Sequence, residues 1–331
     1  MSAAVANAPL LDVRNLRVEI PTRRGALLAL DNVSFTVAPG EILGFVGESG
    51  AGKSLTGMAV LGLLDPPARI TEGDVRLGGR RIDNLSQREM RRVRGKDIGA
   101  VFQDPLMSLN PLLRIGDQLT ETIRTHLPVT MAEATKRAID LMRAVGIPAA
   151  ESRFADYPHQ FSGGMRQRIV VALAICAEPT LIVADEPTTA LDVSIQAQVL
   201  QLLKNLCRDR GTAMLLVTHD MGVIAETADR VAVMYAGRIV EVGAVESVIR
   251  SPVHPYTRGL MGAIPPLEEV AGTLAQIDGA MPRLNARPKG CAFNPRCPDA
   301  IAQCRDQCPQ LEPLGGRQVA CWVATRQRVP A

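Results

Sequence analysis

Residues 47–54 read Gly-Glu-Ser-Gly-Ala-Gly-Lys-Ser, in which a glycine, four further residues and Gly-Lys-Ser have the spacing of a phosphate-binding loop. Glycines let the backbone N–H groups of such a loop converge on phosphate oxygens, and a helix that begins after it adds positive potential. Lys53 would reach the β- and γ-phosphates, and Ser54 would ligate Mg²⁺. The predicted nucleotide contacts are Gly47, Glu48, Ser49, Gly50, Ala51, Gly52, Lys53, Ser54 and Leu55.

A second candidate group is the acid pair Asp185-Glu186, which follows the apolar residues 181–184. A buried strand would deliver Asp185 to the carboxyl edge of a sheet as a Mg²⁺ partner, and Glu186 would orient or deprotonate water. By itself the pattern more often marks a strand that ends in solvated acids. Its combination with a phosphate loop favours the functional interpretation.

The elements that must position these residues alternate between strands and helices. Residues 42–46 predict a short buried strand and residues 53–64 a helix, on either side of the glycine-rich loop. Residues 105–177 are mostly helical in pattern and are divided by prolines, which indicates a helical insertion. The remaining expected strands are 10–20, 29–37, 98–102, 180–184, 213–218 and 231–234, and the remaining helices are 194–207 and 221–228. This order predicts an α/β fold with a mostly parallel core sheet, preceded by antiparallel N-terminal strands.

Composition excludes several other classes of protein. The 331 residues are 47% hydrophobic, with one Trp, three Tyr and six Phe, so the core must be aliphatic. A net charge of +3 lacks the basic excess of proteins that bind nucleic acid chiefly through phosphates. No apolar run approaches the roughly 18 residues of a membrane-spanning helix, and the N-terminus lacks the features of a secretory signal.

The order of motifs along the chain resembles that of the nucleotide-binding subunit of ATP-binding-cassette (ABC) transporters. After the phosphate loop come Gln103, the turn Ser162-Gly163-Gly164, the acid pair, Ala190-Leu191-Asp192 and His219. The resemblance covers about residues 10–250. It implies ATP hydrolysis in a head-to-tail dimer, with ATP held between one subunit's phosphate loop and the other's Ser162-Gly163-Gly164 turn.

The resemblance also implies a role for each of the remaining motif residues. Gln103 would contact Mg²⁺ and sense the γ-phosphate, His219 would contact the γ-phosphate and hold the attacking water, and Asp192 would lie at the dimer interface. Each has an ordinary alternative: Gln103 could begin a surface loop and His219 could end a strand. Asp220 is expected to cap the helix from Met221.

Two features of the sequence depart from the family pattern. Phe161 and Met165 flank the Ser-Gly-Gly turn where the family usually has Leu and Gln. The family also usually stacks an aromatic ring on adenine, but the aromatic residues between Leu10 and Gly47 are Phe35 and Phe45, both expected in strands.

A narrower resemblance is to the ATP-binding subunits of dipeptide and oligopeptide importers. It rests on Gln103-Asp104-Pro105 with Ser108-Leu109-Asn110-Pro111, on Tyr157-Pro158-His159-Gln160, and on His254-Pro255-Tyr256-Thr257. It implies a peripheral subunit at the cytoplasmic face of the inner membrane, with a second ATPase subunit, two transmembrane permease subunits and an external substrate-binding protein as partners. The alternatives are an ABC-type ATPase that acts on DNA or ribosomes, and an importer of nickel or another small solute.

Seven cysteines form two groups. Cys176 and Cys207 lie in helical patterns and are expected in the core, whereas five cysteines crowd into residues 291–321. Thiols this dense favour zinc or an iron–sulfur cluster. The peptide-importer resemblance implies a [4Fe–4S] cluster, structural or redox-sensing, on Cys291, Cys297, Cys304 and Cys321, with Cys308 extra. We accordingly divide the chain into a nucleotide-binding domain, 1–265, and a C-terminal extension, 266–331.

Overall fold

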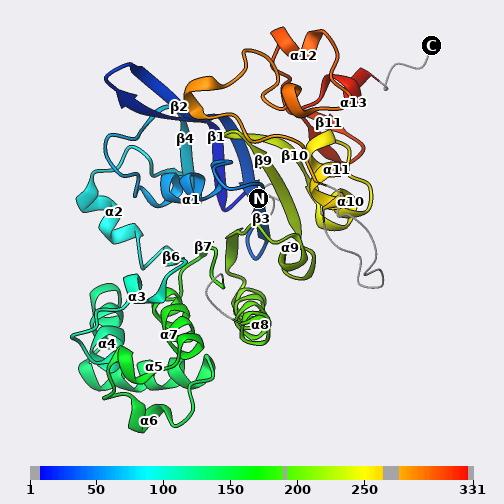
Figure 1. Cartoon of the computed structure of the whole chain (residues 1–331). Helices are drawn as coiled ribbons and strands as arrows, with labels where there is room; N and C mark the ends of the chain where they lie inside the picture. Colours follow the sequence, from blue (N-terminus) through cyan, green and yellow to red (C-terminus); the bar gives the residue numbers. More distant parts are fainter. Residues whose placement is uncertain (1–7, 189–191, 264–275, 327–331) are drawn as a thin grey trace, which may run out of the picture. The chain divides into compact units, whose positions relative to one another are not determined.

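The computed structural model describes residues 8–188, 192–263 and 276–326, drawn in colour in Figure 1. The chain divides into two units, between which it passes several times. The first unit comprises residues 1–11, 37–42 and 76–216. The second comprises residues 12–36, 43–75 and 217–331.

The second unit is built on strand β3 (Ile42–Val46), whose five residues are all buried. Its hydrogen-bonded neighbour is β9 (Arg230–Tyr235), and the two strands run parallel, with Val46 opposite Val233. On the far side of β9, β10 (Arg238–Ala244) and β12 (Arg317–Val319) continue the sheet as antiparallel strands. The parallel pair places residue 47 at the carboxyl end of a buried strand, where α/β proteins bind their ligands.

A smaller sheet contains the N-terminal strands, in the order β2-β1-β4-β5. Strands β4 and β5 pair antiparallel. The expected extended segments 10–20 and 29–37 correspond to β1 and β2, which are longer than the sequence pattern suggests because Thr22 and Gly25 close a hairpin between them. The bounds are Leu11–Thr22 for β1, Gly25–Val37 for β2, Arg69–Leu77 for β4 and Arg80–Arg81 for β5.

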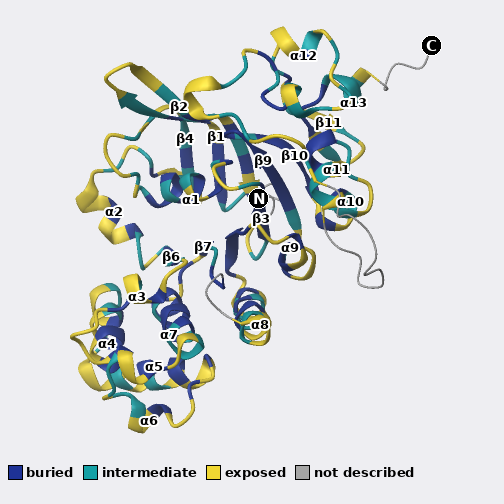
Figure 2. Cartoon of the chain, viewed as in Figure 1, coloured by how far each residue is buried: buried dark blue, intermediate teal, exposed yellow. Residues whose placement is uncertain are grey.

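The first unit contains the parallel pair β6 (Ile98–Val101) and β7 (Leu181–Asp185), together with β8 (Ala213–Val217), which is the other neighbour of β7 in the strand order. The expected helical insertion is present between β6 and β7. Its longer helices turn buried faces toward one another and exposed faces outward (Figure 2). The helices are α3 (Pro105–Ser108), α4 (Ile115–His126), α5 (Met131–Ala144), α6 (Ala150–Arg153) and α7 (Gly163–Ile175), and α2 (Gln87–Val93) and α8 (Val193–Arg210) also belong to this unit.

Beyond residue 250 the chain is more ordered than its proline content suggests. α11 (Pro255–Gly262) begins one residue after His254, whose Nδ1 accepts the Tyr256 N–H at 3.1 Å. Pro255 occupies the first position of this helix, where a proline costs no hydrogen bond. The other elements are α10 (Val245–Arg250), η2 (Leu284–Ala286), η3 (Asn294–Arg296), α12 (Gln303–Asp306), β11 (Glu312–Leu314) and α13 (Trp322–Arg326). The predicted domain boundary at residue 265 lies outside the described residues.

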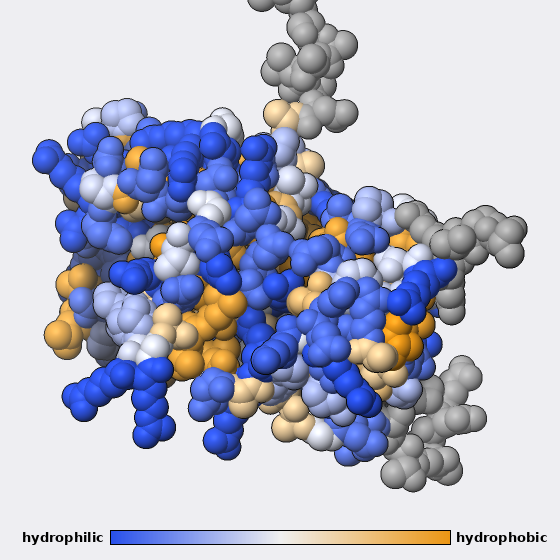
Figure 3. All heavy atoms as spheres, turned by 90° about the horizontal axis from the view of Figure 1, so that it is seen from above, coloured by the Kyte–Doolittle hydropathy of each residue, from blue (hydrophilic) through white to orange (hydrophobic). Residues whose placement is uncertain are grey.

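Within the described residues no helix has both the length and the apolar character needed to cross a membrane. Hydrophilic side chains cover most of the face seen in Figure 3, with apolar side chains between them. Cys176 and Cys207 are fully buried, as expected of small core residues. Burial raises the pKa of Cys176 to about 12, so its thiol is neutral.

Candidate nucleotide-binding site

The predicted phosphate loop connects β3 to α1 (Lys53–Leu61), as strand, loop and helix. Gly47 and Gly52 have φ values of 150° and 105°, which favour glycine. A Cβ atom at Gly47 would overlap the carbonyl oxygen of Met234 on β9, so this position also requires the absence of a side chain. α1 ends at Gly62, in a left-handed conformation with its N–H bonded to Ala59 O, and is therefore shorter than the predicted helix 53–64.

Lys53 and Ser54, the two side chains of the loop with an assigned chemistry, stand at the start of α1. Lys53 is almost fully buried, and its ammonium donates to the carbonyl oxygens of Gly47 and Glu48, at 2.8 and 3.2 Å. Ser54 is exposed, as are Ser49 and Gly50. The lysine therefore lies across the loop, while the helix N-terminus and the tip of the loop remain accessible to a phosphate.

Glu48, the second residue of the loop, is held by residues far away in the sequence. Its N–H donates to the Tyr256 hydroxyl at 2.9 Å. Its carboxylate receives Arg296 Nη1, which lies 3.0 Å from both oxygens. No sequence motif predicts a chemical role for either partner.

The first unit carries the acid pair. Asp185 is the last residue of β7, and both Asp185 and Glu186 are partly exposed. Glu186 has a φ of 46°, a left-handed conformation that costs energy for any residue other than glycine. Such conformations persist where the surrounding structure enforces them, and they concentrate at functional sites. Gln103 lies two residues beyond β6 and is exposed.

The Ser162-Gly163-Gly164 turn begins α7, also in the first unit. Ser162 is the N-cap, and its hydroxyl accepts the Met165 N–H at 3.4 Å. Ser162 and Gly163 are exposed, so the turn presents its backbone to solvent. Asp192 caps α8 in the same way, accepting the Ile195 N–H at 2.9 Å, and is exposed. Ala190 and Leu191 lie outside the described residues.

His219 follows β8 and is exposed. The adjacent Asp220 accepts the N–H groups of Gly222 and Val223 and so caps α9 (Met221–Thr227), which confirms the expected helix cap. Phe35 and Phe45 are both buried and pack edge to face, with ring centroids 4.9 Å apart. Neither ring is available to stack on a nucleotide base.

Two protein-family models match the chain. The model described as ABC transporter matches residues 30–189, and the one described as oligopeptide/dipeptide transporter, C-terminal region, matches residues 240–304. The oligopeptide transport ATP-binding protein OppD of Salmonella typhimurium is 46% identical over 314 residues, which are 95% of this chain and 93% of that protein. The chain belongs to the ABC transporter family. Similar relatives are the dipeptide transport ATP-binding protein DppD of Bacillus subtilis, 45% identical (95% and 94% covered), and a putative peptide import ATP-binding protein of Brucella abortus, 46% identical (97% of both).

Solved structures of ATP-binding cassettes resemble this chain over more than two thirds of its length. The ATP-binding cassette MJ0796, in a dimeric post-hydrolysis state bound to ADP and Pi, has a TM-score of 0.64 and 29% identity. The match covers 71% of this chain and 98% of MJ0796. CbiO1 of Clostridium perfringens, at 24% identity and a TM-score of 0.64, shares the fold (74% of this chain and 92% of CbiO1 are covered). The predicted ABC ATPase fold is thereby confirmed.

Five free thiols of this ABC ATPase lie in the C-terminal part of the sequence: Cys291, Cys297, Cys304, Cys308 and Cys321. The pKa of Cys291 is raised to about 12, chiefly by burial and to a smaller extent by the neighbouring Cys304, Cys308 and Cys297. Within the described residues, however, no group of three or more His, Cys, Asp or Glu side chains is arranged to hold a metal ion. The predicted [4Fe–4S] or zinc site is therefore not supported by the structure.

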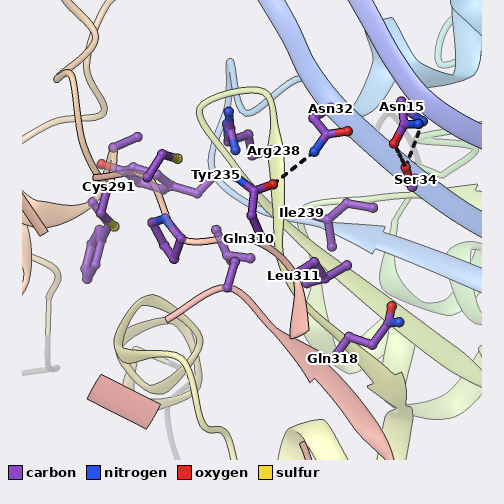
Figure 4. A pocket seen from close by; sticks show the side chains of 16 residues that line it. Asn15, Asn32, Ser34, Tyr235, Arg238, Ile239, Cys291, Gln310, Leu311 and Gln318 are labelled. Atoms are coloured by element: carbon purple, nitrogen blue, oxygen red, sulfur yellow. Dashed lines mark hydrogen bonds between the residues drawn. The ribbon is translucent and has the colours of Figure 1, made fainter. Parts of the chain in front are cut away.

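A cavity of about 230 Å³ is lined in part by two of these five cysteines. Cys291 and Cys308 line it, whereas the other three cysteines of the segment do not. Figure 4 shows Tyr235 and Cys291 on one side and Asn15 and Ser34 on the other. Asn32 and Gln310 also line the cavity, and the Asn32 amide donates to the Gln310 side-chain oxygen at 3.1 Å (Figure 4). Cys308, the predicted spare cysteine, thus shares surroundings with one of the four predicted ligands.

Proposed function

We propose that the chain is the ATP-hydrolysing motor subunit of an importer of dipeptides or oligopeptides. The observation that carries the proposal is whole-length similarity to peptide-transport ATP-binding proteins, which extends through the C-terminal region at residues 240–304. ABC cassettes in general share the first part of this chain. The C-terminal region is what distinguishes the peptide branch from an ATPase that acts on DNA or ribosomes.

In the proposed reaction the loop 47–55 binds the triphosphate of ATP, with Lys53 neutralising the β- and γ-phosphates. Glu186 accepts a proton from the attacking water, and His219 holds that water against the γ-phosphate. Support for these roles comes from the accessible helix start at Ser54, the left-handed backbone of Glu186 and the exposure of His219. Backbone N–H groups of the Ser162-Gly163-Gly164 turn complete the site from a second cassette.

The donor set suits Mg²⁺, which prefers oxygen ligands: the Ser54 hydroxyl, the Asp185 carboxylate and the Gln103 amide oxygen. Bound there, Mg²⁺ would neutralise the charge that develops on the phosphates. Gln103 lies between β6 and the helical insertion, so the proposal also assigns it the link between the site and α3–α7.

The C-terminal thiols enter the proposal as ligands of a [4Fe–4S] cluster, on Cys291, Cys297, Cys304 and Cys321. Their support is the chemistry of the donors, since five free cysteines lie within one short segment. No step of ATP hydrolysis is assigned to the cluster. Its proposed role is structural, because a metal can fold a segment too small to bury a core.

The partners in this proposal are a second ATPase subunit, identical or related, two membrane-spanning permease subunits and an external substrate-binding protein. The chain would lie at the cytoplasmic face of the inner membrane. Affinity purification of the full chain from detergent-solubilised membranes tests this: integral membrane subunits should co-purify in stoichiometric amount. Stable association with DNA or ribosomes, and no membrane partner, would contradict it. Nickel and other small solutes are tested in the same preparation by substrate-stimulated ATPase activity.

A further inference from the structure

The phosphate loop is fixed at Glu48 by two side chains from the C-terminal part of the second unit. Tyr256 accepts the backbone N–H of Glu48, and Arg296 binds its carboxylate. Both contacts lie within one compact unit and join residues more than 200 positions apart. The Glu48 N–H is therefore directed at the phenol, so the loop's contacts with phosphate must come from its other N–H groups.

Arg296 is held rigidly in this position. Its Nε donates to Asp278 O at 2.8 Å, and its Nη2 donates to Ile277 O at 3.1 Å. Its Nη1 also reaches the Tyr235 hydroxyl at 3.3 Å. The side chain is only 6% exposed, against 30% for Glu48. A guanidinium so enclosed has little freedom to follow a moving partner, so it determines where the Glu48 carboxylate lies.

Tyr256 is also fixed in place, by packing in an aromatic cluster. Its ring centroid lies 4.6 Å from that of Tyr235 and 5.4 Å from that of Phe293, and the side chain is fully buried. Burial raises the pKa of Tyr256, which keeps the phenol neutral. Phe293 stands three residues before Arg296, so both contacts to Glu48 depend on the same short segment.

The position of Glu48 also affects Lys53, the residue proposed to bind the β- and γ-phosphates. Lys53 donates to the carbonyl oxygens of Gly47 and Glu48. The Gly47 carbonyl belongs to the same peptide group as the Glu48 N–H that donates to Tyr256, and the Glu48 carbonyl belongs to the next peptide group. A displacement of Glu48 would therefore move the acceptors that orient the lysine ammonium.

We propose that Arg296 and Tyr256 are positioning residues for ATP binding, which hold the phosphate loop through Glu48 and make its shape depend on the C-terminal segment around residues 276–299. The proposal rests on ATP binding at this loop, as given under Proposed function. Both residues contact Glu48 and act through the shape of the loop, so we expect their substitution to change ATP affinity.

The test compares Arg296→Lys and Tyr256→Phe with the wild-type full chain. Arg296→Lys keeps the charge but loses the fork of donors, and Tyr256→Phe leaves the Glu48 N–H without its acceptor. We expect each to raise the Kd and KM for Mg-ATP by about fivefold or more, with kcat at saturating ATP within about twofold. The matched control is Arg305→Lys, at an exposed position of α12, which should leave both constants unchanged. Unchanged ATP affinity in folded Arg296→Lys and Tyr256→Phe would overturn the proposal.

A double-mutant cycle separates positioning from a general loss of stability. Glu48→Gln keeps the size of the side chain and removes its charge. If Arg296 acts through Glu48, adding Arg296→Lys to Glu48→Gln should raise the Kd for ATP by less than about twofold further. If the double variant instead shows the product of the two separate increases in Kd, Arg296 does not act through Glu48 and the proposal is contradicted. A lowered unfolding temperature with unchanged ATP affinity would also contradict it. Absence of ATP binding by the wild-type chain would instead contradict the proposed function.

Discussion

Arg317 Nη1 lies 3.2 Å from Oε1 of Glu241, a carboxylate with no exposed surface. The same carboxylate accepts the N–H groups of Val253 and His254, and Arg317 also donates to the hydroxyl of Ser247. The pair thus fixes the chain immediately before the segment that carries Tyr256. It connects the β10 strand to the residues that hold the phosphate loop.

Removal of Arg317 should destabilise the protein strongly. Arg317→Ala leaves a fully buried carboxylate without its cation, for which we expect a loss of about 3–5 kcal/mol in the free energy of unfolding. The matched control is Arg250→Ala, which breaks the 3.2 Å pair with Glu246 at the surface and should cost less than about 0.5 kcal/mol. Urea unfolding of both variants measures this. If both variants lose the same small amount of unfolding free energy, the buried Glu241 carboxylate does not depend on Arg317, and the prediction is wrong.

Gly47 and Gly50 should respond differently to alanine, although both have positive φ. At Gly50 the Cβ would meet nothing within 4 Å, so Gly50→Ala should cost only the strain of the backbone, about 1–2 kcal/mol. At Gly47 the Cβ would overlap the Met234 carbonyl, so Gly47→Ala should cost clearly more and also weaken ATP binding. Thermal unfolding with and without Mg-ATP measures both effects. A Gly47→Ala variant as stable as Gly50→Ala would contradict the close approach of the loop to β9.

His254 should make stability depend on pH. Burial lowers its pKa from 6.5 to about 3, so between these values the unfolded chain binds a proton that the folded chain does not. Stability is therefore lost as the pH falls below 6.5, by about 2 kcal/mol between pH 6.5 and 4.5. His254→Asn keeps an N-cap acceptor for the Tyr256 N–H but cannot be protonated. The free energies of unfolding of the two proteins should converge as the pH is lowered from about 7.5 to about 4.5, and parallel curves would contradict the assignment.

The cysteine ligands are tested by metal content. If a [4Fe–4S] cluster forms on the proposed four cysteines, anaerobically purified Cys321→Ser should lose iron and sulfide, whereas Cys308→Ser should retain them. Loss of iron and sulfide in Cys308→Ser but not in Cys321→Ser would make Cys308 a ligand in place of Cys321. Zinc in place of iron would show that the cysteines form a zinc site. Wild-type protein without bound metal would contradict the proposed metal site.

The sequence predicts the local parts of the site well. The apolar run 42–46, the glycines of the loop and the acid pair at the end of β7 are each encoded by neighbouring residues, and the structure places each in the expected element. Asp220 is predictable as a helix cap for the same reason, since a cap and its helix adjoin in sequence.

The parts that the sequence does not reveal depend on contacts between distant residues. Tyr256 and Arg296 bind Glu48 across more than 200 positions, and no periodicity links them. The motif around His254 is visible in the sequence, but its role in placing Tyr256 emerges only once burial and the Glu241 carboxylate are known. The end of α1 at Gly62 is a local signal that the predicted helix 53–64 overlooks.

ATP hydrolysis at this site, with Glu186 as the base, is proposed to drive peptide import. Glu186→Gln should lower ATP turnover by about 10²- to 10⁴-fold while ATP binding stays within about twofold of the wild type. A matched control is Glu178→Gln, because Glu178 is exposed to solvent and has a φ of 56°, close to the 46° of Glu186. This control should hydrolyse ATP at the wild-type rate.

The most direct measurement follows ATP hydrolysis and uptake of a labelled dipeptide in the same membrane vesicles, which carry the chain with its permease partners. Vesicles with Glu186→Gln should bind ATP, retain the subunit on the membrane and lose both hydrolysis and uptake, whereas vesicles with Glu178→Gln should keep both. Uptake at the wild-type level in Glu186→Gln vesicles would contradict the role of Glu186 as the base whose reaction drives import.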